Sequence, residues 1–276
     1  MYFSLVRCSK RVRTIISAIL LIVFAGCGYA EYETRLNESK RYFAYLEKIE
    51  SSLAPKWVVA GNLMEMRVPR QFVLIPAPQP IQNPDGTTEQ PTIDSRQPDY
   101  LNLTLPGLFG AWQAPFRVVK PTGTEDCQGY IYALSNYYDL GSKQASEATE
   151  FTTQLKELLK ETLKEEVKDE SDESFPPGQA NTQYQTQLTY NVFRIKGAEI
   201  NGTKYTFEVY SRSRGNVIGA ILIVLPVDME MPSKELERIS TRIPMMLATF
   251  DFTQTPPAIG ESPSAPPQPK STGASF

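Results

Sequence analysis

Nine consecutive apolar residues, 217–225, restrict the possible folds of this chain more than any other segment. The run ends at Pro226, and it is too short to cross a bilayer as a helix, which takes about 20 residues. A strand with apolar side chains on both faces has to be covered on both faces. The sequence therefore predicts a buried β-strand with helices or other layers packed on each side of it.

Two further strands precede this run and are predicted to pair with each other. The dipeptide Asn201-Gly202 lies between the segments 190–195 and 205–210. An Asn-Gly pair between two strand-like segments is a strong signal for a β-hairpin. We expect residues 211–216 to form a polar loop that leads into the buried strand, so that the three strands make an antiparallel meander.

The first half of the chain contains shorter strand signals and one insertion. Residues 63–68, 72–75 and 129–134 have the composition of strands. The segment 76–98 is rich in Pro, and we expect a surface loop or a flexible insertion there. We expect residues 101–119 to pack as an irregular apolar segment.

Three segments have apolar residues at helical spacing, namely 31–54, 144–168 and 233–250. The second is the clearest, and we interpret the acidic run 169–173 after it as its solvated end. Pro244 lies inside the third segment and is expected to kink that helix. Helices and antiparallel strands together predict the α+β class.

The N-terminus has the three parts of an export signal. Four basic residues and no acidic residue lie within 1–13, an apolar stretch covers 15–24, and Ala25-Gly26-Cys27 follows. This ending resembles a bacterial lipoprotein signal, in which small residues precede the cysteine that becomes the mature N-terminus. A plain secreted protein and an uncleaved N-terminal anchor are the alternatives.

The resemblance implies a membrane anchor at Cys27. Residues 1–26 would be removed, and Cys27 would carry two or more fatty acyl chains, which is enough for stable anchoring. In lipoprotein families an Asp after the cysteine favours retention at the inner membrane, and this chain has Gly28 there. We therefore expect a protein of the bacterial cell envelope, at the outer membrane and facing the periplasm.

These observations divide the chain into four parts. We expect a signal peptide at 1–26, a lipid-anchored amphipathic helix at 27–56 and an α+β domain at 57–253. Residues 254–276 are a Pro-rich tail whose composition predicts disorder. The insertion at 76–98 belongs to the α+β domain.

The composition excludes several classes of function. The sequence contains no histidine, so a Ser-His-Asp triad, a Cys-His pair and a histidine-ligated metal site cannot form within it. Removal of 1–26 would lower the net charge from −3 to −7, which argues against a nucleic-acid partner. We therefore predict no cofactor, no metal site and no nucleic acid.

The sequence contains no catalytic signature. Phosphate-binding and nucleophile motifs are absent. After processing, Cys127 would be the one free thiol, and Asp126 beside it is expected to raise the pKa of that thiol. A pair of carboxylates far apart in the sequence stays open as an alternative.

Two pairs of residues are candidates for binding a ligand. Arg212 and Arg214 could bind a carboxylate or a lipid head group, although two arginines in a polar loop are equally explained by solubility. Tyr130 and Tyr132 are spaced by two and would share one face of a strand. They could form a platform for a sugar or a peptide, or they could be ordinary amphipathic packing at a sheet edge.

The order of elements over about residues 60–252 resembles Mog1/PsbP-like domains. The resemblance depends on the strand entry Arg67-Val68-Pro69, the meander and the closing helix that ends at 245–250. It implies one antiparallel sheet with helices packed on it, in an α/β/α sandwich. Members of that fold mostly bind or scaffold other proteins, although a fold does not determine a function.

We therefore expect a lipid-anchored module without catalytic activity that binds or scaffolds another envelope protein. The alternatives are an envelope hydrolase that uses carboxylates and a carrier of a small lipid-like ligand.

Overall fold

The computed structural model describes residues 29–79, 81–82, 88–89, 94–121, 123–141, 150–177 and 186–257. The chain divides into two compact units, 1–49 with 180–186 and 50–179 with 187–276. The expected signal peptide and Cys27 lie outside the described residues, as does the tail beyond Pro257.

The helix α2 (Tyr29–Ser52) begins in the first unit and ends in the second. Within the first unit, Tyr32, Leu36 and Phe43 are exposed. An ion pair of 2.6 Å between Arg35 and Glu31 joins neighbouring turns. Every other described helix and strand belongs to the second unit.

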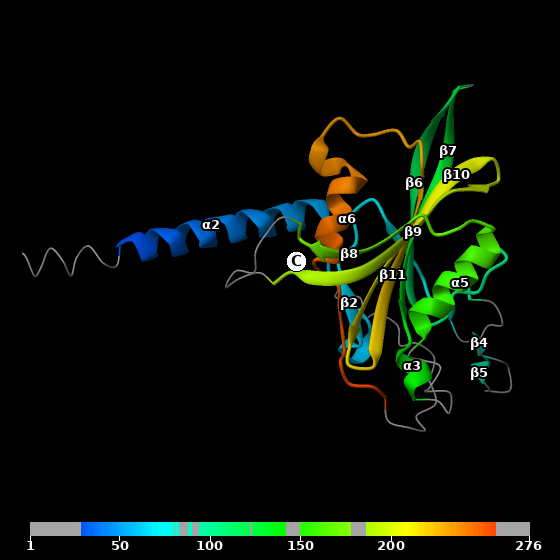
Figure 1. Cartoon of the computed structure of the whole chain (residues 1–276), viewed down its shortest axis with the longest axis horizontal. Coiled ribbons are helices and arrows are strands. Elements are labelled where there is room, and N and C mark those ends of the chain that lie inside the picture. Colours follow the sequence, from blue (N-terminus) through cyan, green and yellow to red (C-terminus); the bar gives the residue numbers. More distant parts are fainter. Residues whose placement is uncertain are drawn as a thin grey trace, which may run out of the picture. The chain divides into compact units, whose positions relative to one another are not determined.

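A seven-stranded antiparallel sheet forms the body of the second unit (Figure 1). Its strands in order across the sheet are β3 (Val73–Ile75), β6 (Leu108–Lys120), β7 (Gly123–Ser135), β11 (Val217–Pro226), β10 (Thr203–Arg214), β9 (Leu188–Ile200) and β8 (Asp169–Phe175). The predicted buried strand is β11, which pairs with β7 on one side and β10 on the other. The α+β class and the meander of β9, β10 and β11 are therefore confirmed.

The hairpin between β9 and β10 turns at the predicted dipeptide. Asn201 and Gly202 both have positive φ values, of 49° and 77°. Two successive residues with positive φ are what the common two-residue hairpin turn requires, and Asn and Gly adopt this conformation most readily. The local sequence therefore fixes this turn.

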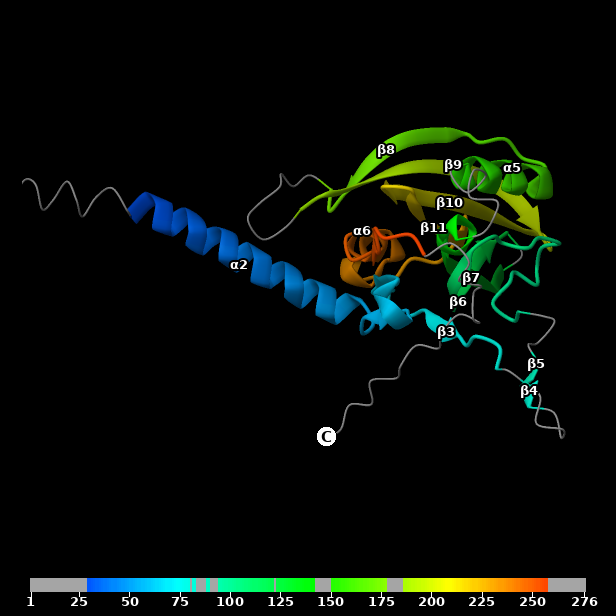
Figure 2. The same ribbon diagram turned by 90° about the horizontal axis from the view of Figure 1, so that it is seen from below.

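Helices cover both faces of the large sheet. On one face α5 (Phe151–Leu163) buries Phe151, Leu155 and Leu159 in a cluster with Phe193 of β9. On the other face, the backbone oxygen of Leu247 at the end of α6 (Ile239–Leu247) accepts a hydrogen bond from Tyr190. Tyr190 and Phe193 have opposite parity along β9, so the two helices lie on opposite faces (Figure 2).

The smaller elements lie around this core. They are the three-stranded sheet β1 (Trp57–Val58), β2 (Met64–Met66) and β12 (Asp251–Phe252), the pair β4 (Ile81–Gln82) and β5 (Thr88–Glu89), the helix α3 (Tyr137–Leu140), and the 3₁₀ turns η1 (Ala60–Asn62) and η2 (Glu235–Glu237). The expected single sheet is thus one of three in the described residues. The additional three-stranded sheet joins β2 to β12, which lie far apart in the sequence, and local patterns do not reveal such a pairing.

Two segments expected to be irregular or helical are strands. Most of the segment 101–119 forms β6, which pairs with β7 along nearly its whole length. Part of β6 is buried on both faces, so the alternation that marks a strand is missing there. The acidic run 169–173 is β8 rather than a helix end, because α5 already stops at Leu163 with Lys164 in the left-handed conformation.

The predicted loop at 211–216 and the predicted closing helix also differ from the structure. β10 continues to Arg214, so only Gly215 and Asn216 form the turn. The predicted helix over 233–250 is divided into η2 and α6, and Pro244 lies inside α6. The expected insertion at 76–98 is anchored at its end by Arg96, which is 5% exposed.

Candidate functional site

The two candidate arginines both bind the carboxylate of Asp251. Arg212 Nη2 lies 2.9 Å and Arg214 Nη1 lies 2.5 Å from Asp251 Oδ1. Each guanidinium also donates a hydrogen bond of 2.9 Å to the backbone, Arg212 to the oxygen of Phe250 and Arg214 to that of Phe252. The pair therefore holds the segment 250–252 against the sheet.

Aromatic rings enclose Arg212. Its guanidinium carbon lies 4.9 Å from the ring centre of Phe252, 5.8 Å from that of Tyr190 and 5.9 Å from that of Phe250. The side chain is 10% exposed, and this burial lowers the pKa of Arg212. Arg212 therefore stabilises the fold by binding Asp251 and the backbone of Phe250. To bind Arg212, an external carboxylate or lipid head group would have to displace Asp251.

The two candidate tyrosines lie together with a third tyrosine that sequence reasoning missed. Tyr132 is 1% exposed, and its hydroxyl oxygen is 3.0 Å from that of Tyr100. The Tyr100 ring stacks on Tyr130 with a centroid distance of 4.4 Å. Tyr130 and Tyr132 do share one face, but Tyr130 alone of the two is partly exposed. Tyr100 therefore covers most of the surface that Tyr130 and Tyr132 would offer to a sugar or a peptide.

The thiol of Cys127 is not activated. Burial, followed by the charges of Glu125 and Asp126, raises its pKa. The effect of Asp126 is in the predicted direction, although burial is the larger cause. A raised pKa leaves little thiolate at neutral pH, so this thiol is a poor nucleophile.

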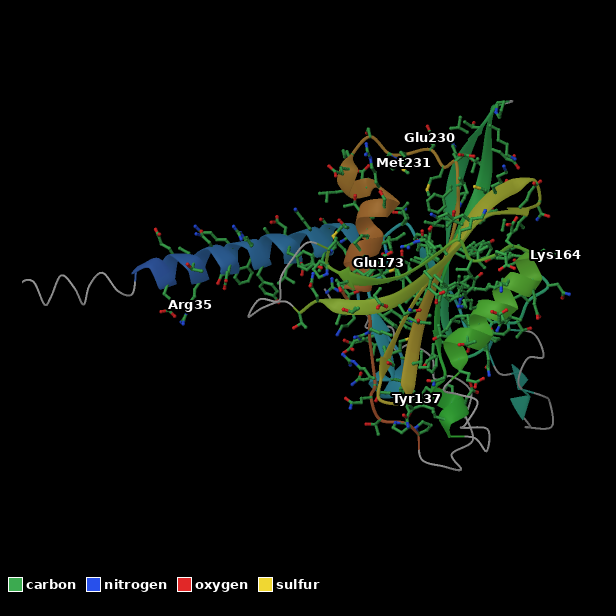
Figure 3. The ribbon with its side chains drawn as sticks, in the orientation of Figure 1. Arg35, Tyr137, Lys164, Glu173, Glu230 and Met231 are labelled. Atoms are coloured by element: carbon green, nitrogen blue, oxygen red, sulfur yellow. The ribbon has the colours of Figure 1, made fainter. Side chains whose placement is uncertain are left out.

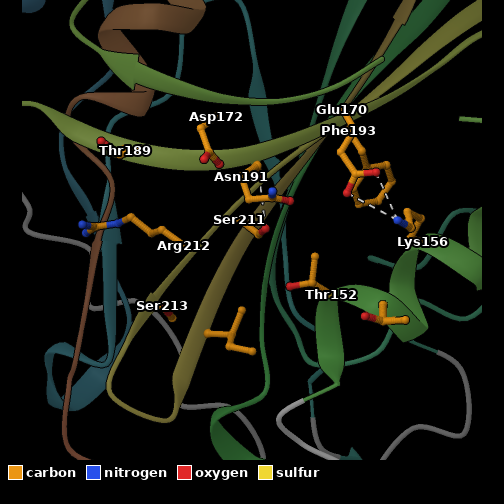
Figure 4. A pocket seen from close by; sticks show the side chains of 12 residues that line it. Thr152, Lys156, Glu170, Asp172, Thr189, Asn191, Phe193, Ser211, Arg212 and Ser213 are labelled. Atoms are coloured by element: carbon orange, nitrogen blue, oxygen red, sulfur yellow. Dashed lines mark hydrogen bonds and ion pairs between the residues drawn. The ribbon is translucent and has the colours of Figure 1, made fainter. Parts of the chain in front are cut away.

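A polar groove opens on the α5 face of the sheet, beside the start of α5 (Figure 4). Its volume is about 490 Å³. The lining residues are Thr152, Thr153 and Lys156 of α5, Glu170 and Asp172 of β8, Thr189, Asn191 and Phe193 of β9, Ser211, Arg212 and Ser213 of β10, and Ile218 of β11. Hydroxyl, amide and charged groups therefore make up most of the wall.

One cross-strand row forms the centre of the groove. Asp172 of β8 lies opposite Asn191 of β9, and Asn191 lies opposite Ser211 of β10. The Ser211 hydroxyl donates a hydrogen bond of 3.2 Å to the backbone oxygen of Asn191. The register of three strands thus places a carboxylate, an amide and a hydroxyl side by side. The polar residues at alternate positions 189 and 191, on a face that is otherwise apolar, were the sequence signal that could have found this row.

The two carboxylates of the groove belong to one wall. Glu170 and Asp172 are alternate residues of β8 and point to the same face. Lys156 binds Glu170 at 3.3 Å. Hydrolysis of a glycosidic bond needs two available carboxyl groups, and in this groove the ion pair with Lys156 already engages Glu170.

The strand β8 is the edge of the large sheet. It is hydrogen-bonded to β9 along one side over all seven residues. Glu173 binds Arg194 at 2.7 Å, and this hydrogen bond lowers the pKa of Glu173. Asp169 binds Lys196, and Asp172 has no ion pair within the described residues. β8 is therefore an edge strand, and Asp172, near its middle, has no ion-pair partner among the described residues.

A second groove, of about 430 Å³, lies where the segment after β11 passes β6. Phe116, Met231, Arg117 and Arg242 are among its lining residues, and Figure 3 labels Met231 beside Glu230. Both grooves are open and partly polar. Neither is the enclosed apolar chamber that a carrier of a lipid-like ligand would need.

No family model, curated protein or solved structure matches this chain. Among the described residues, no group of three or more Cys, Asp or Glu side chains could hold a metal ion. In the same residues no helix is long and apolar enough to cross a membrane.

Proposed function

We propose that this chain is a lipid-anchored protein of the bacterial cell envelope that binds another envelope protein and catalyses no reaction. The signal-like segment 1–26 and Cys27 support the anchor. The likeness of residues 60–252 to Mog1/PsbP-like domains, and a location at the outer membrane facing the periplasm, belong to the same proposal.

The exposed edge of β8 is the observation that supports protein binding. Among the described residues, the seven residues of β8 pair only with β9, which leaves one row of backbone N–H and C=O groups for an added strand. A partner segment in extended conformation can use this row, as in β-strand addition. Partner side chains at alternate positions would then face the α5 side of the sheet.

Charge on β8 selects the partner. Two copies of β8 paired edge to edge would bring acidic side chains opposite each other, which is destabilising. A partner strand with Lys or Arg opposite Asp172 would instead form an ion pair. We therefore propose a partner of a different kind, with a basic extended segment, rather than a second copy of this chain.

The anchor is tested by Cys27→Ser. The unmodified chain should fractionate with membranes and carry an acyl mass at its N-terminus, and the variant should keep residues 1–26 or appear in the soluble fraction. A variant that stays in the membrane fraction with unchanged electrophoretic mobility would overturn the lipid anchor.

The binding edge is tested with a photo-crosslinking amino acid in place of Ser171, which is exposed on β8. The matched control carries the same group in place of Glu161, which is exposed on α5. We expect a discrete crosslinked protein in living cells from position 171 and none from position 161. Equal crosslinking from both positions, or none from 171, would contradict binding at this edge.

A hydrolase is the second candidate, because Glu170 and Asp172 share one groove. If they were catalytic, Asp172→Asn would abolish the release of sugars from an envelope polysaccharide. The ion pair between Glu170 and Lys156 favours binding over hydrolysis, because it engages one of the two carboxylates.

A further inference from the structure

We propose that the groove between α5 and the strands β8–β10 binds an uncharged glycan chain without cleaving it. This site lies on the face of the sheet, whereas the proposed protein partner adds to its edge. The two surfaces adjoin and share Asp172, and each has its own test.

The lining of the groove matches the chemistry of a sugar. A glycan presents many hydroxyl groups, each of which both donates and accepts hydrogen bonds. The hydroxyls of Thr152, Thr153 and Ser213 can do both, and the amide of Asn191 adds two donors and an acceptor. Asp172 adds a pure acceptor. A ligand that has both hydrogen-bond donors and acceptors can therefore bind the hydroxyl, amide and carboxylate groups of this wall.

The central groups are free to bind. The side chains of Asp172 and Asn191 have no hydrogen-bond or ion-pair partner within the described residues, and both are exposed. Carboxylate and amide groups are planar and can each bind two adjacent hydroxyls. Because these two residues are direct cross-strand neighbours, they can contact consecutive hydroxyl groups of one sugar ring or of two linked rings.

Other classes of ligand fit less well. An anion would meet the carboxylates of Glu170 and Asp172, and the one lysine of the wall, Lys156, is already paired with Glu170. An apolar ligand would find only two apolar side chains in this groove, Phe193, which is 1% exposed, and the partly buried Ile218. A neutral, polar ligand meets no like charge in this groove and finds hydrogen-bonding side chains along its wall.

The floor of the groove is part of the hydrophobic core. Phe193, next to the central row, packs with Leu155, Leu159 and Val209. The backbone of the lining strands is therefore in place before a ligand binds, which favours affinity for a flexible glycan chain.

Binding of chitotetraose and maltotetraose to the full chain in detergent tests the proposal, with ligand-observed saturation-transfer NMR as the measurement. We expect saturation transfer to at least one of these neutral tetrasaccharides and no shorter sugars after prolonged incubation. Binding of neither sugar would overturn the proposal. The appearance of di- or trisaccharides would overturn binding without cleavage.

Variants locate the site. Asn191→Ala should weaken binding about tenfold, since it removes hydrogen bonds to the ligand. Ser213→Trp should block the groove and remove binding. The matched control is Asn102→Ala, an exposed position outside the groove, which should bind as the unmodified chain does. Unchanged affinity in both groove variants would overturn the site, and crosslinking from position 171 should persist in them.

Discussion

The ring of Phe252 occupies the space directly over Gly219. A Cβ atom added to Gly219 would lie 2.7 Å from both Cδ1 and Cε1 of that ring. Gly219 pairs across the strands with Arg212, whose guanidinium also packs on the ring of Phe252. The glycine thus leaves room for the C-terminal strand β12 to lie on the large sheet.

Replacement of Gly219 by Ala should therefore displace β12. We expect Gly219→Ala to lower the free energy of unfolding by about 1 to 3 kcal/mol, as measured by urea denaturation, because the new methyl group overlaps an aromatic ring. The smaller side chain of Phe252→Leu should recover part of this loss in the double variant. Strictly additive effects of the two changes would contradict direct contact as the cause.

The carboxylate of Asp251 neutralises two guanidinium groups, and Arg212 is largely buried. Asp251→Asn leaves Arg212 without its ionic partner, so we expect a loss of about 1 to 3 kcal/mol in the free energy of unfolding. The control Asp228→Asn changes an exposed acid outside this cluster and should alter stability by less than about 0.5 kcal/mol. Similar losses in both variants would point to a general charge effect.

Arg96 is buried at the end of the expected insertion. It donates two hydrogen bonds, of 3.0 and 2.7 Å, to the two carboxylate oxygens of Asp94 and one of 2.9 Å to the backbone oxygen of Phe109. Lysine cannot reproduce this planar pattern, so Arg96→Lys should cost about 2 kcal/mol in urea denaturation. The exposed Arg117→Lys should be nearly neutral. A neutral Arg96→Lys would show that the segment is not anchored by these bonds.

Stability should fall at alkaline pH through buried tyrosines. Burial, followed by the nearby Cys127 and Tyr130, raises the pKa of Tyr205 from 10.0 to about 12. The folded state therefore favours the neutral phenol, and this contribution is complete below pH 10 and is lost as the pH rises towards 12. Urea denaturation at several pH values should show a smaller alkaline loss for Tyr205→Phe than for the unmodified chain. Identical pH profiles would exclude this contribution.

Local patterns in the sequence predict those elements that have a long continuous apolar run or a characteristic turn. The hairpin at Asn201-Gly202 and the apolar run of β11 have such signals, and both are confirmed. β6 has neither signal, because Gln113, Pro115 and Arg117 interrupt its apolar residues, and the acidic composition of β8 favours a solvated helix end. What makes β8 a strand is its pairing with β9, which follows it in the chain after a long connection.

In the candidate sites too, the sequence indicates single residues, whereas the fold decides which residues they contact. Residue type and position indicate Arg212 and Arg214, but their partner Asp251 lies in a segment separated from them by β11 and α6. No single segment indicates the groove, since its residues come from α5, β8, β9, β10 and β11. Single-segment patterns do not indicate which side chains of different strands become neighbours.

The sequence by itself determines the buried central strand, the hairpin turn and the α+β class, because periodicity and turn chemistry are properties of neighbouring residues. Only the tertiary structure decides that Asp172, Asn191 and Ser211 form one row and that Asp251 joins Arg212 to Arg214. The physical reason is strand register. A shift of one residue would move every side chain of a strand to the other face, so neither the polar row nor the cluster of Asp251 with the two arginines would form.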